Sequence, residues 1–394
     1  MMSKKMRSEK KGISLIMLVI TIIVIIILSV AVILSIANNN PIENAKESKN
    51  KHNKATLEEA ANIEYAALYA NSQIKGETFD TETIRNNLKN QGFSEEDVKK
   101  VEITDKGLYI AKYLPIVPTG FVASQVKGET EISTGLVIYE GTTPVTDENI
   151  ENARASRNQY VWVPVDDISE FVRESFKSEL LDLKVYTEPF TGKDDDGNNA
   201  NISEKEEYNA MYESVKKYHG FYIARYEASK NISTSKPLSL PNLTPWSSII
   251  WGKSMTDLSG GAVEAARAIY PASTASTKSA VSTLCYGVQW DQTVRFIAKN
   301  YPEISKDSTK YGNYDANSKI STGSNPSYAQ NNIYDMCGNL KEWTMEANSS
   351  NIRVTRGGSY YSSGSSSTLS SRDIDCYPEW EIIMVGFRVA LYIK

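Results

Sequence analysis

The sequence predicts an α+β protein with three parts: an N-terminal transmembrane helix, a small α+β spacer, and a C-terminal domain of short strands and long loops. Three observations lead to this fold class. An uncharged apolar run covers residues 13–37, and a helical hydrophobic period follows at 56–74. From residue 114 onward, brief apolar runs alternate with polar stretches that contain glycine and proline. With 394 residues, the chain is long enough for two or three domains.

The amino end is first basic and then apolar. Residues 1–12 form a leader with five basic residues and one acidic residue, and residues 13–37 carry no charge. A helix of this length, at about 1.5 Å per residue, exceeds the roughly 30 Å hydrocarbon core of a bilayer. The basic leader therefore predicts a single-pass protein of the bacterial cell membrane with an extracellular C-terminal domain. A secretory signal cleaved after Ala37 and an ordinary signal anchor are the alternatives.

The junction between leader and apolar run resembles the type IV prepilin cleavage site. Lys11-Gly12 precedes Ile13, and the resemblance implies that a peptidase cuts between Gly12 and Ile13. The glutamate that the family carries at the fifth mature position is replaced here by Met17. The resemblance implies pilin-like subunits as partners, and a minor pilin with the C-terminal domain as its head is one functional alternative.

Residues 38–113 are predicted to form a helical stalk and the α+β spacer. The strongest helical pattern is the run at 56–74, where apolar residues recur every three or four positions. Ser94 has the position of a helix cap before an acidic first turn. The other elements expected in this part are two short helices and a hairpin, at 81–89, 94–99 and 101–111.

Residues 114–394 are predicted to form the C-terminal domain, because Pro115, Pro118 and Gly120 mark a boundary. Apolar runs predict strands at 135–140, 159–165, 220–229 and 386–393. Periodic patterns predict helices at 203–219 and 290–300.

Charge and composition exclude several classes of function. The net charge is −5, and it becomes more negative still without the basic leader, so nucleic acid is not expected as a partner. The three cysteines and two histidines have no zinc-ligand spacing. Tyrosine is far more frequent than phenylalanine, which suits a recognition surface.

Five phrases occur in a fixed order: YVWVPV (160–165), GFYIARYEAS (220–229), NIYDMCGNLKEWT (332–344), RVTRGGSYY (353–361) and VGFRVAL (385–391). Together they resemble the formylglycine-generating-enzyme, or sulfatase-modifying-factor, domain, which is a variant of the C-type-lectin fold. The resemblance covers about 117–394 and implies a small sheet with many ordered loops. Arg356 and Arg388 stand among apolar residues, so we expect them to be buried and paired with carboxylates such as Glu342 or Glu227.

The resemblance also implies a structural calcium site. Asp335 and Glu342 would supply side-chain oxygens, and Gly338 and Leu340 would supply backbone carbonyls, which are the hard ligands that Ca²⁺ prefers. The alternative is a turn held by hydrogen bonds without a metal.

The catalytic cysteines of the family are replaced in this chain. They would stand at Ser362 and Ser367, and a serine hydroxyl near neutral pH is neither a thiolate nucleophile nor a soft metal ligand. The iron-dependent branch needs three histidines, whereas this domain has only His219. We therefore expect no catalytic metal and favour an inactive domain. An oxygen-dependent enzyme of the family is the alternative.

The segment 359–377 is rich in serine and tyrosine, as antibody loops are, and this favours a surface loop that binds an extracellular protein or glycan. It lacks Lys, Glu, Gln, Met and Trp, which is typical of loops diversified by retroelements that randomise adenines. A fixed binding loop and a loop that only seals the fold are the alternatives. The residues predicted to contact the ligand are Tyr360, Tyr361, Ser362, Ser363, Ser365, Ser367, Asp373, Asp375, Tyr377 and Trp380.

Overall fold

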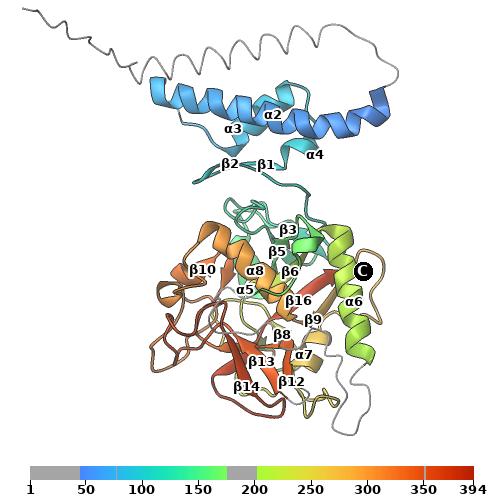
Figure 1. Ribbon diagram of the computed structural model, residues 1–394, viewed down its shortest axis with the longest axis vertical. Helices are drawn as coiled ribbons and strands as arrows, with labels where there is room; N and C mark the ends of the chain where they lie inside the picture. Colours follow the sequence, from blue (N-terminus) through green and yellow to red (C-terminus); the bar gives the residue numbers. More distant parts are fainter. Residues whose placement is uncertain (1–44, 77, 175–201, 350–351) are drawn as a thin grey trace, which may run out of the picture. The chain divides into compact units, whose positions relative to one another are not determined.

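The computed structural model describes residues 45–76, 78–174, 202–349 and 352–394 (Figure 1). The chain divides into two compact units, of which the first ends at Ile110 and the second begins at Ala111.

Within these ranges, no helix combines the length and the apolar surface needed to span a bilayer. The longest described helix, α2 (Ala45–Lys75), has 31 residues but carries charged residues such as Lys54, Glu58 and Glu64 along its length. This finding contradicts the transmembrane helix in the predicted fold class and the predicted localisation as a single-pass membrane protein. The run at 13–37, together with Gly12, lies outside the described residues, so cleavage there stays a prediction.

The described part of the first unit contains helices and a hairpin within the range 38–113 that the sequence predicts as stalk and α+β spacer. Its helix α2 contains the predicted run at 56–74. Ser94 caps the short helix α4, since its hydroxyl accepts a hydrogen bond from the N–H of Asp97 at 3.1 Å. The remaining elements are α3 (Thr81–Asn90), α4 (Glu95–Val98), β1 (Val101–Thr104) and β2 (Gly107–Ile110). Six buried side chains form the core: Leu57, Ala61, Ile84, Leu88, Val98 and Val101.

The second unit contains short strands joined by long loops. Its helices are α5 (Ile150–Ser156), α6 (Ile202–Tyr218), α7 (Ala262–Arg267) and α8 (Gly287–Asn300), with 3-10 turns η1 (Ile168–Glu170), η2 (Thr309–Tyr311) and η3 (Pro326–Tyr328). The strands up to residue 300 are β3 (Phe121–Ala123), β4 (Val137–Glu140), β5 (Gln159–Pro164), β6 (Gly220–Ala224), β7 (Ser229–Lys230), β8 (Pro237–Leu238) and β9 (Ala280–Leu284). The later strands are β10 (Ala329–Gln330), β11 (Ile333–Tyr334), β12 (Lys341–Ser349), β13 (Ile352–Arg356), β14 (Arg372–Cys376), β15 (Val385–Phe387) and β16 (Val389–Ile393).

The larger sheet of this unit has six strands in the order β3-β4-β5-β6-β16-β9. All residues of β5, β6, β9 and β16 are buried, as expected for apolar runs without polar alternation. The last strand of the chain pairs with both β6 and β9, and α6 packs along β6 and β16 (Figure 1). The two predicted helices and the predicted strands at 135–140 and 159–165 are confirmed to within three residues. The predicted strand at 220–229 ends at Ala224, and the one at 386–393 is divided between β15 and β16.

The smaller sheet has the order β14-β13-β12-β15. Strand β15 pairs in parallel with β12 and leads directly into β16, so a single segment belongs to both sheets. Arg388 lies at this crossing and is fully buried. Its guanidinium donates to the Glu342 carboxylate at 2.8 Å and to the carbonyl oxygen of Ala224 at 2.9 Å. The predicted buried pair of Arg388 and Glu342 is confirmed, and it ties the two sheets together.

Candidate ligand-binding face

The loop between β13 and β14, residues 357–371, begins with two glycines in left-handed conformations. Gly357 has φ +89° and Gly358 has φ +73°, which residues with a Cβ rarely adopt. A Cβ on Gly357 would lie 2.7 Å from the carbonyl oxygen of Met336, and one on Gly358 would lie 2.4 Å from that of Ser367. The Gly-Gly pair therefore lets the loop turn closely against its surroundings.

Buried hydrogen bonds fix the second half of the loop. The indole N–H of Trp290 in α8 donates to the carbonyl oxygen of Leu369 at 2.9 Å, and the N–H of Leu369 donates to the Ser308 hydroxyl at 2.9 Å. The Ser370 hydroxyl donates to the carbonyl oxygen of Ser305 at 3.0 Å. Because Trp290, Ser308 and Leu369 are fully buried, these bonds hold the second half of the loop firmly to the rest of the fold.

A cluster of five charged residues joins the two ends of the loop, with Arg173 pairing to Glu346 as its outermost member. Arg356 donates to Asp291 at 2.7 Å and to Glu346 at 2.9 Å. Arg372 pairs with the second oxygen of Glu346 at 2.6 Å and also with Asp291. Arg356 is thus a buried ion, as predicted, but its partners are Asp291 and Glu346. Burial acts to raise the pKa of Glu346, yet Arg356 and Arg372 outweigh it and lower that pKa to about 2.

Large apolar side chains are exposed on this loop and on the segment that follows β14. Tyr361 is 75% exposed, Trp380 46% and Ile383 63%. The rings of Tyr377 and Trp380 contact each other with centroids 4.9 Å apart. The Ser359 hydroxyl lies 3.8 Å from the sulfur of Met384, so the segments that carry Tyr361 and Ile383 are neighbours. We call Tyr361, Tyr377, Trp380 and Ile383 the aromatic face.

The other predicted ligand contacts differ in exposure. Ser365 and Asp375 are exposed, while Asp373 is half-buried and pairs with Lys341. The Ser362 hydroxyl lies 3.0 Å from that of Ser359. The half-buried members of the predicted set are Tyr360, Ser362, Ser363, Ser367, Asp373 and Tyr377.

The three thiols of the chain are buried and none forms a disulfide. Burial raises the pKa of Cys337 to about 12 and that of Cys376 to about 11. Near neutral pH both groups therefore stay as thiols, which are poor nucleophiles and poor metal ligands compared with thiolates.

His219, the single histidine of the second unit, has a structural environment. It adopts φ +60° at the end of α6, and its ring stacks on Tyr113 with centroids 3.4 Å apart. Burial, and then the nearby Lys112, lower the pKa of His219. The ring is thus held by packing.

The four predicted calcium ligands do not form a ligand set. Both oxygens of Glu342 accept hydrogen bonds from Arg388, at 2.8–3.2 Å. One oxygen of Asp335 accepts from the N–H of Gly323 at 2.7 Å, and the other is buried without a hydrogen-bond partner among the described residues. Across the part of the chain that the structure describes, no three His, Cys, Asp or Glu residues are grouped to hold a metal. Because the guanidinium of Arg388 already pairs with the Glu342 carboxylate, Glu342 does not fit the role of a calcium ligand in this arrangement, whereas the roles of Asp335, Gly338 and Leu340 stay a prediction.

The buried carboxyl groups around Arg388 outnumber its single charge. Burial raises the pKa of Asp335 to about 6. Burial, and then the neighbouring Asp335 and Glu342, raise the pKa of Glu227 well above its usual value. Glu227 accepts hydrogen bonds from Asn339 at 2.5 Å and from the N–H of Leu340 at 3.0 Å. The negative charge of these carboxyl groups is therefore reduced in two ways: Arg388 pairs with Glu342, and the raised pKa values favour protonated carboxyl groups.

Asp335→Asn tests this balance. The raised folded-state pKa of Asp335 means that its favourable contribution is present below its unfolded pKa and is lost as pH rises through about 6. Asparagine stays neutral and tolerates the φ of +56° at this position. We expect D335N to be more stable than the wild type by about 1–2 kcal/mol near pH 8 and equally stable near pH 4. Urea unfolding of both proteins at both pH values, with and without Ca²⁺, measures this difference in the free energy of unfolding. A calcium-dependent stabilisation of the wild type that D335N abolishes would contradict it.

Comparison with known proteins finds a family model that matches the C-terminal part of the chain. No curated protein matches the chain. Among solved structures, the "Crystal Structure of CarF" is similar with 19% identity and a TM-score of 0.24, and the match covers 29% of this chain and 48% of that one. "Treponema denticola variable protein 1" is similar with 15% identity and a TM-score of 0.24, covering 59% of this chain and 84% of that one. The chain thus spans about half of the CarF chain.

A family model matches the region that contains both the aromatic face and the buried ion-pair cluster. The predicted resemblance begins earlier, near residue 117, so the phrases at 160–165 and 220–229 lie outside the matched range. The three C-terminal phrases lie inside it. The family model that matches residues 270–393 is described as the Sulfatase-modifying factor enzyme 1-like domain.

Proposed function

We propose that the second unit is a catalytically inactive sulfatase-modifying-factor domain that binds a protein or glycan through the aromatic face. The observation that carries this proposal is a fixed loop base beneath exposed aromatic side chains. Trp290, Ser305 and Ser308 hold the loop from below, while Tyr361 and Trp380 point away from the core.

The distribution of exposed apolar side chains supports a binding role. Of the six large apolar residues that are exposed in the described part of the second unit, three lie between residues 361 and 383. Single exposed apolar residues are normal on protein surfaces, but a group of them favours an interaction site. Because the base of the loop is already ordered, binding would cost little additional backbone entropy.

The chemistry of the face suits either class of ligand. Tyrosine and tryptophan are frequent hot-spot residues in protein interfaces. Their flat apolar rings also suit the apolar faces of sugar rings, and the exposed Ser365 and Asp375 would supply hydrogen bonds to hydroxyl groups. The serines at 362 and 367, together with the buried thiols, support binding rather than oxidation as the activity.

A binding screen tests the proposal. The full chain would be applied to a glycan array and to an array of purified bacterial and host surface proteins, beside a variant with Tyr361, Trp380 and Ile383 replaced by alanine. We expect at least one class of array element to retain the wild type and not the variant. The proposal would be wrong if no element bound the wild type, or if the two proteins gave the same pattern.

A further inference from the structure

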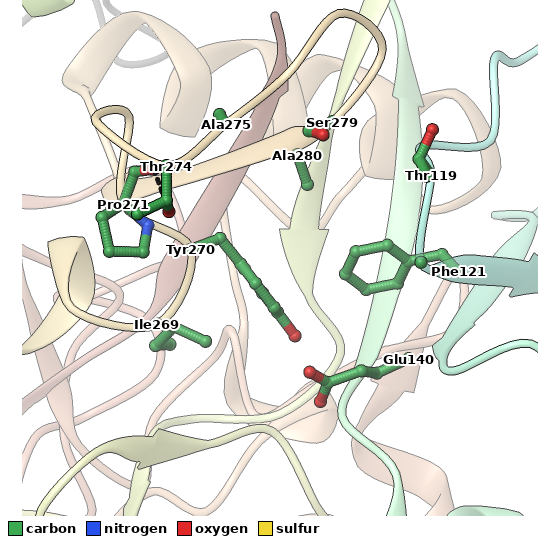
Figure 2. A pocket seen from close by; sticks show the side chains of 11 residues that line it. Thr119, Phe121, Glu140, Ile269, Tyr270, Pro271, Thr274, Ala275, Ser279 and Ala280 are labelled. Carbon is green, nitrogen blue, oxygen red and sulfur yellow. Dashed lines mark hydrogen bonds between the residues drawn. The ribbon is translucent and has the colours of Figure 1, made fainter.

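A second candidate site lies where the two edges of the six-stranded sheet approach each other. The edge strands are β3 and β9, and Thr119, just before β3, forms an isolated parallel bridge with Ser279, just before β9. The N–H of Thr119 donates to the carbonyl oxygen of Lys278 at 2.9 Å. Between the two edges is a pocket of about 260 Å³ (Figure 2). It is lined by parts of segments 119–121 and 269–280 together with Glu140.

Aromatic rings form two walls of this pocket. Phe121 and Tyr270 both line it, and their ring centroids are 5.3 Å apart at an interplanar angle of 70°. The buried Tyr160 packs behind them, 5.8 Å from Phe121 and 6.2 Å from Tyr270. Aromatic faces carry partial negative charge, so such walls attract cations.

A carboxylate completes the pocket. Glu140 is the last residue of β4, and Figure 2 shows its side chain directed toward the Tyr270 hydroxyl. One Glu140 oxygen accepts from the side-chain amide of Asn158 at 2.9 Å, and among the described residues the carboxylate has no ion-pair partner. The nearby Arg157 is directed to backbone instead, donating to the carbonyl oxygens of Glu140 and Thr143.

The buried Tyr270 hydroxyl has the Glu140 carboxylate and the Tyr160 hydroxyl as its polar neighbours, although no hydrogen bond of normal geometry joins it to a described residue. A buried polar group without a partner is costly, and native proteins seldom keep one without a reason. Burial, and then the neighbouring Tyr160 and Glu140, raise the pKa of Tyr270, so the hydroxyl stays protonated and neutral. Its oxygen is therefore available as an acceptor beside the Glu140 carboxylate.

We propose that this pocket binds a single alkylammonium group. The ammonium would lie between Glu140 and the Tyr270 hydroxyl and donate to both, while its aliphatic chain packs against Phe121 and Ile269. The volume is below the roughly 300–1,000 Å³ of most small-molecule sites, which limits the ligand to one short cationic chain. A free alkylamine and a lysine side chain share this chemistry.

Four probes test the proposal by titration calorimetry on the full chain. n-Butylammonium represents a free amine, and Nα-acetyl-lysine methylamide represents a lysine side chain. Butanol and Nα-acetyl-norleucine methylamide are their uncharged counterparts. We expect at least one ammonium probe to bind about tenfold more tightly than its counterpart, because cation–π contacts and a charge-assisted hydrogen bond act together. If both ammonium probes bind, the alkylammonium group alone is sufficient for binding. If only the lysine probe binds, the ligand is a lysine side chain of a protein.

Variants separate the pocket from the rest of the surface. Glu140→Gln keeps the acceptor for Asn158 and should abolish the preference for the charged probe. Tyr270→Phe removes only the hydroxyl beside Glu140, and we expect about threefold weaker binding with little loss of thermal stability. The exposed Glu379 serves as a matched control, and Glu379→Gln should change nothing. Equal binding of charged and uncharged probes, no saturable binding of either ammonium probe, or an unchanged preference in E140Q would overturn the proposal. These results are independent of the aromatic face.

Discussion

Replacing Arg356 with methionine is expected to lower the free energy of unfolding by about 3–5 kcal/mol, because it leaves buried carboxylates short of a partner. The side chain is 1% exposed and bonds to both Asp291 and Glu346. It also donates to the carbonyl oxygens of Ser370 and Ser371 at the end of the loop. The substitution should therefore loosen the base of the aromatic face as well as destabilise the unit.

Urea unfolding measures this effect, and Lys216→Met is the matched control. Lys216 pairs with Glu213 at 3.7 Å, but both side chains are more than half exposed, so its loss should cost less than about 1 kcal/mol. Arg356→Lys keeps the charge without the forked geometry and should fall between the two. A loss of stability in R356M no larger than that in K216M would contradict the assigned role of the buried cluster.

The largest functional effect is expected from the triple variant Tyr361→Ala, Trp380→Ala and Ile383→Ala. Truncation of an aromatic hot spot commonly costs 2 kcal/mol or more, so we expect at least a roughly hundredfold loss of affinity for a ligand found in the binding screen. Thermal stability should stay nearly unchanged because these three side chains are exposed. Surface plasmon resonance gives the affinity, and thermal unfolding gives the stability.

Ile232→Ala is the control for this variant. Ile232 is 95% exposed and lies in the turn between β7 and β8, outside the aromatic face. Its truncation removes a similar apolar side chain and should leave affinity unchanged. If I232A weakened binding as strongly as the triple variant, the effect would come from general surface changes and the assigned face would be wrong.

Several strands and helices of the second unit could be predicted because apolar runs and helical periodicity are local features of the sequence. The apolar runs at 159–165 and 220–229 contain fully buried strands, and the helical patterns at 203–219 and 290–300 correspond to α6 and α8. The burial of Arg388 was also predictable, since a lone arginine in an apolar strand needs a nearby carboxylate.

The partners of the buried charges were harder to predict. Arg356 was expected to pair with Glu342 or Glu227, but Asp291 lies 65 residues away in α8 and is placed by tertiary packing. The calcium prediction rested on residue types within one turn, whereas Arg388 reaches Glu342 from a different strand. Ile383 was missed because its own segment has no strand or helix pattern.

The pocket of Phe121, Glu140 and Tyr270 has no local sequence signal either. Phe121 and Glu140 come from β3 and β4, Tyr270 comes from the segment between α7 and β9, and the approach of Thr119 to Ser279 brings the two segments together. Thr119 and Ser279 are about 160 residues apart in the sequence. Hydrophobic periodicity indicates local helices and strands and does not show which distant residues pair.

The most direct test of the central claim is an assay for aldehyde formation on a cysteine-containing peptide by the full chain, with copper and oxygen supplied. Because Ser362 and Ser367 replace the family thiols, and because burial raises the pKa of both Cys337 and Cys376, we expect no aldehyde above a protein-free control. Formation of aldehyde that Cys376→Ala removes would contradict the account and assign the domain an enzymatic role.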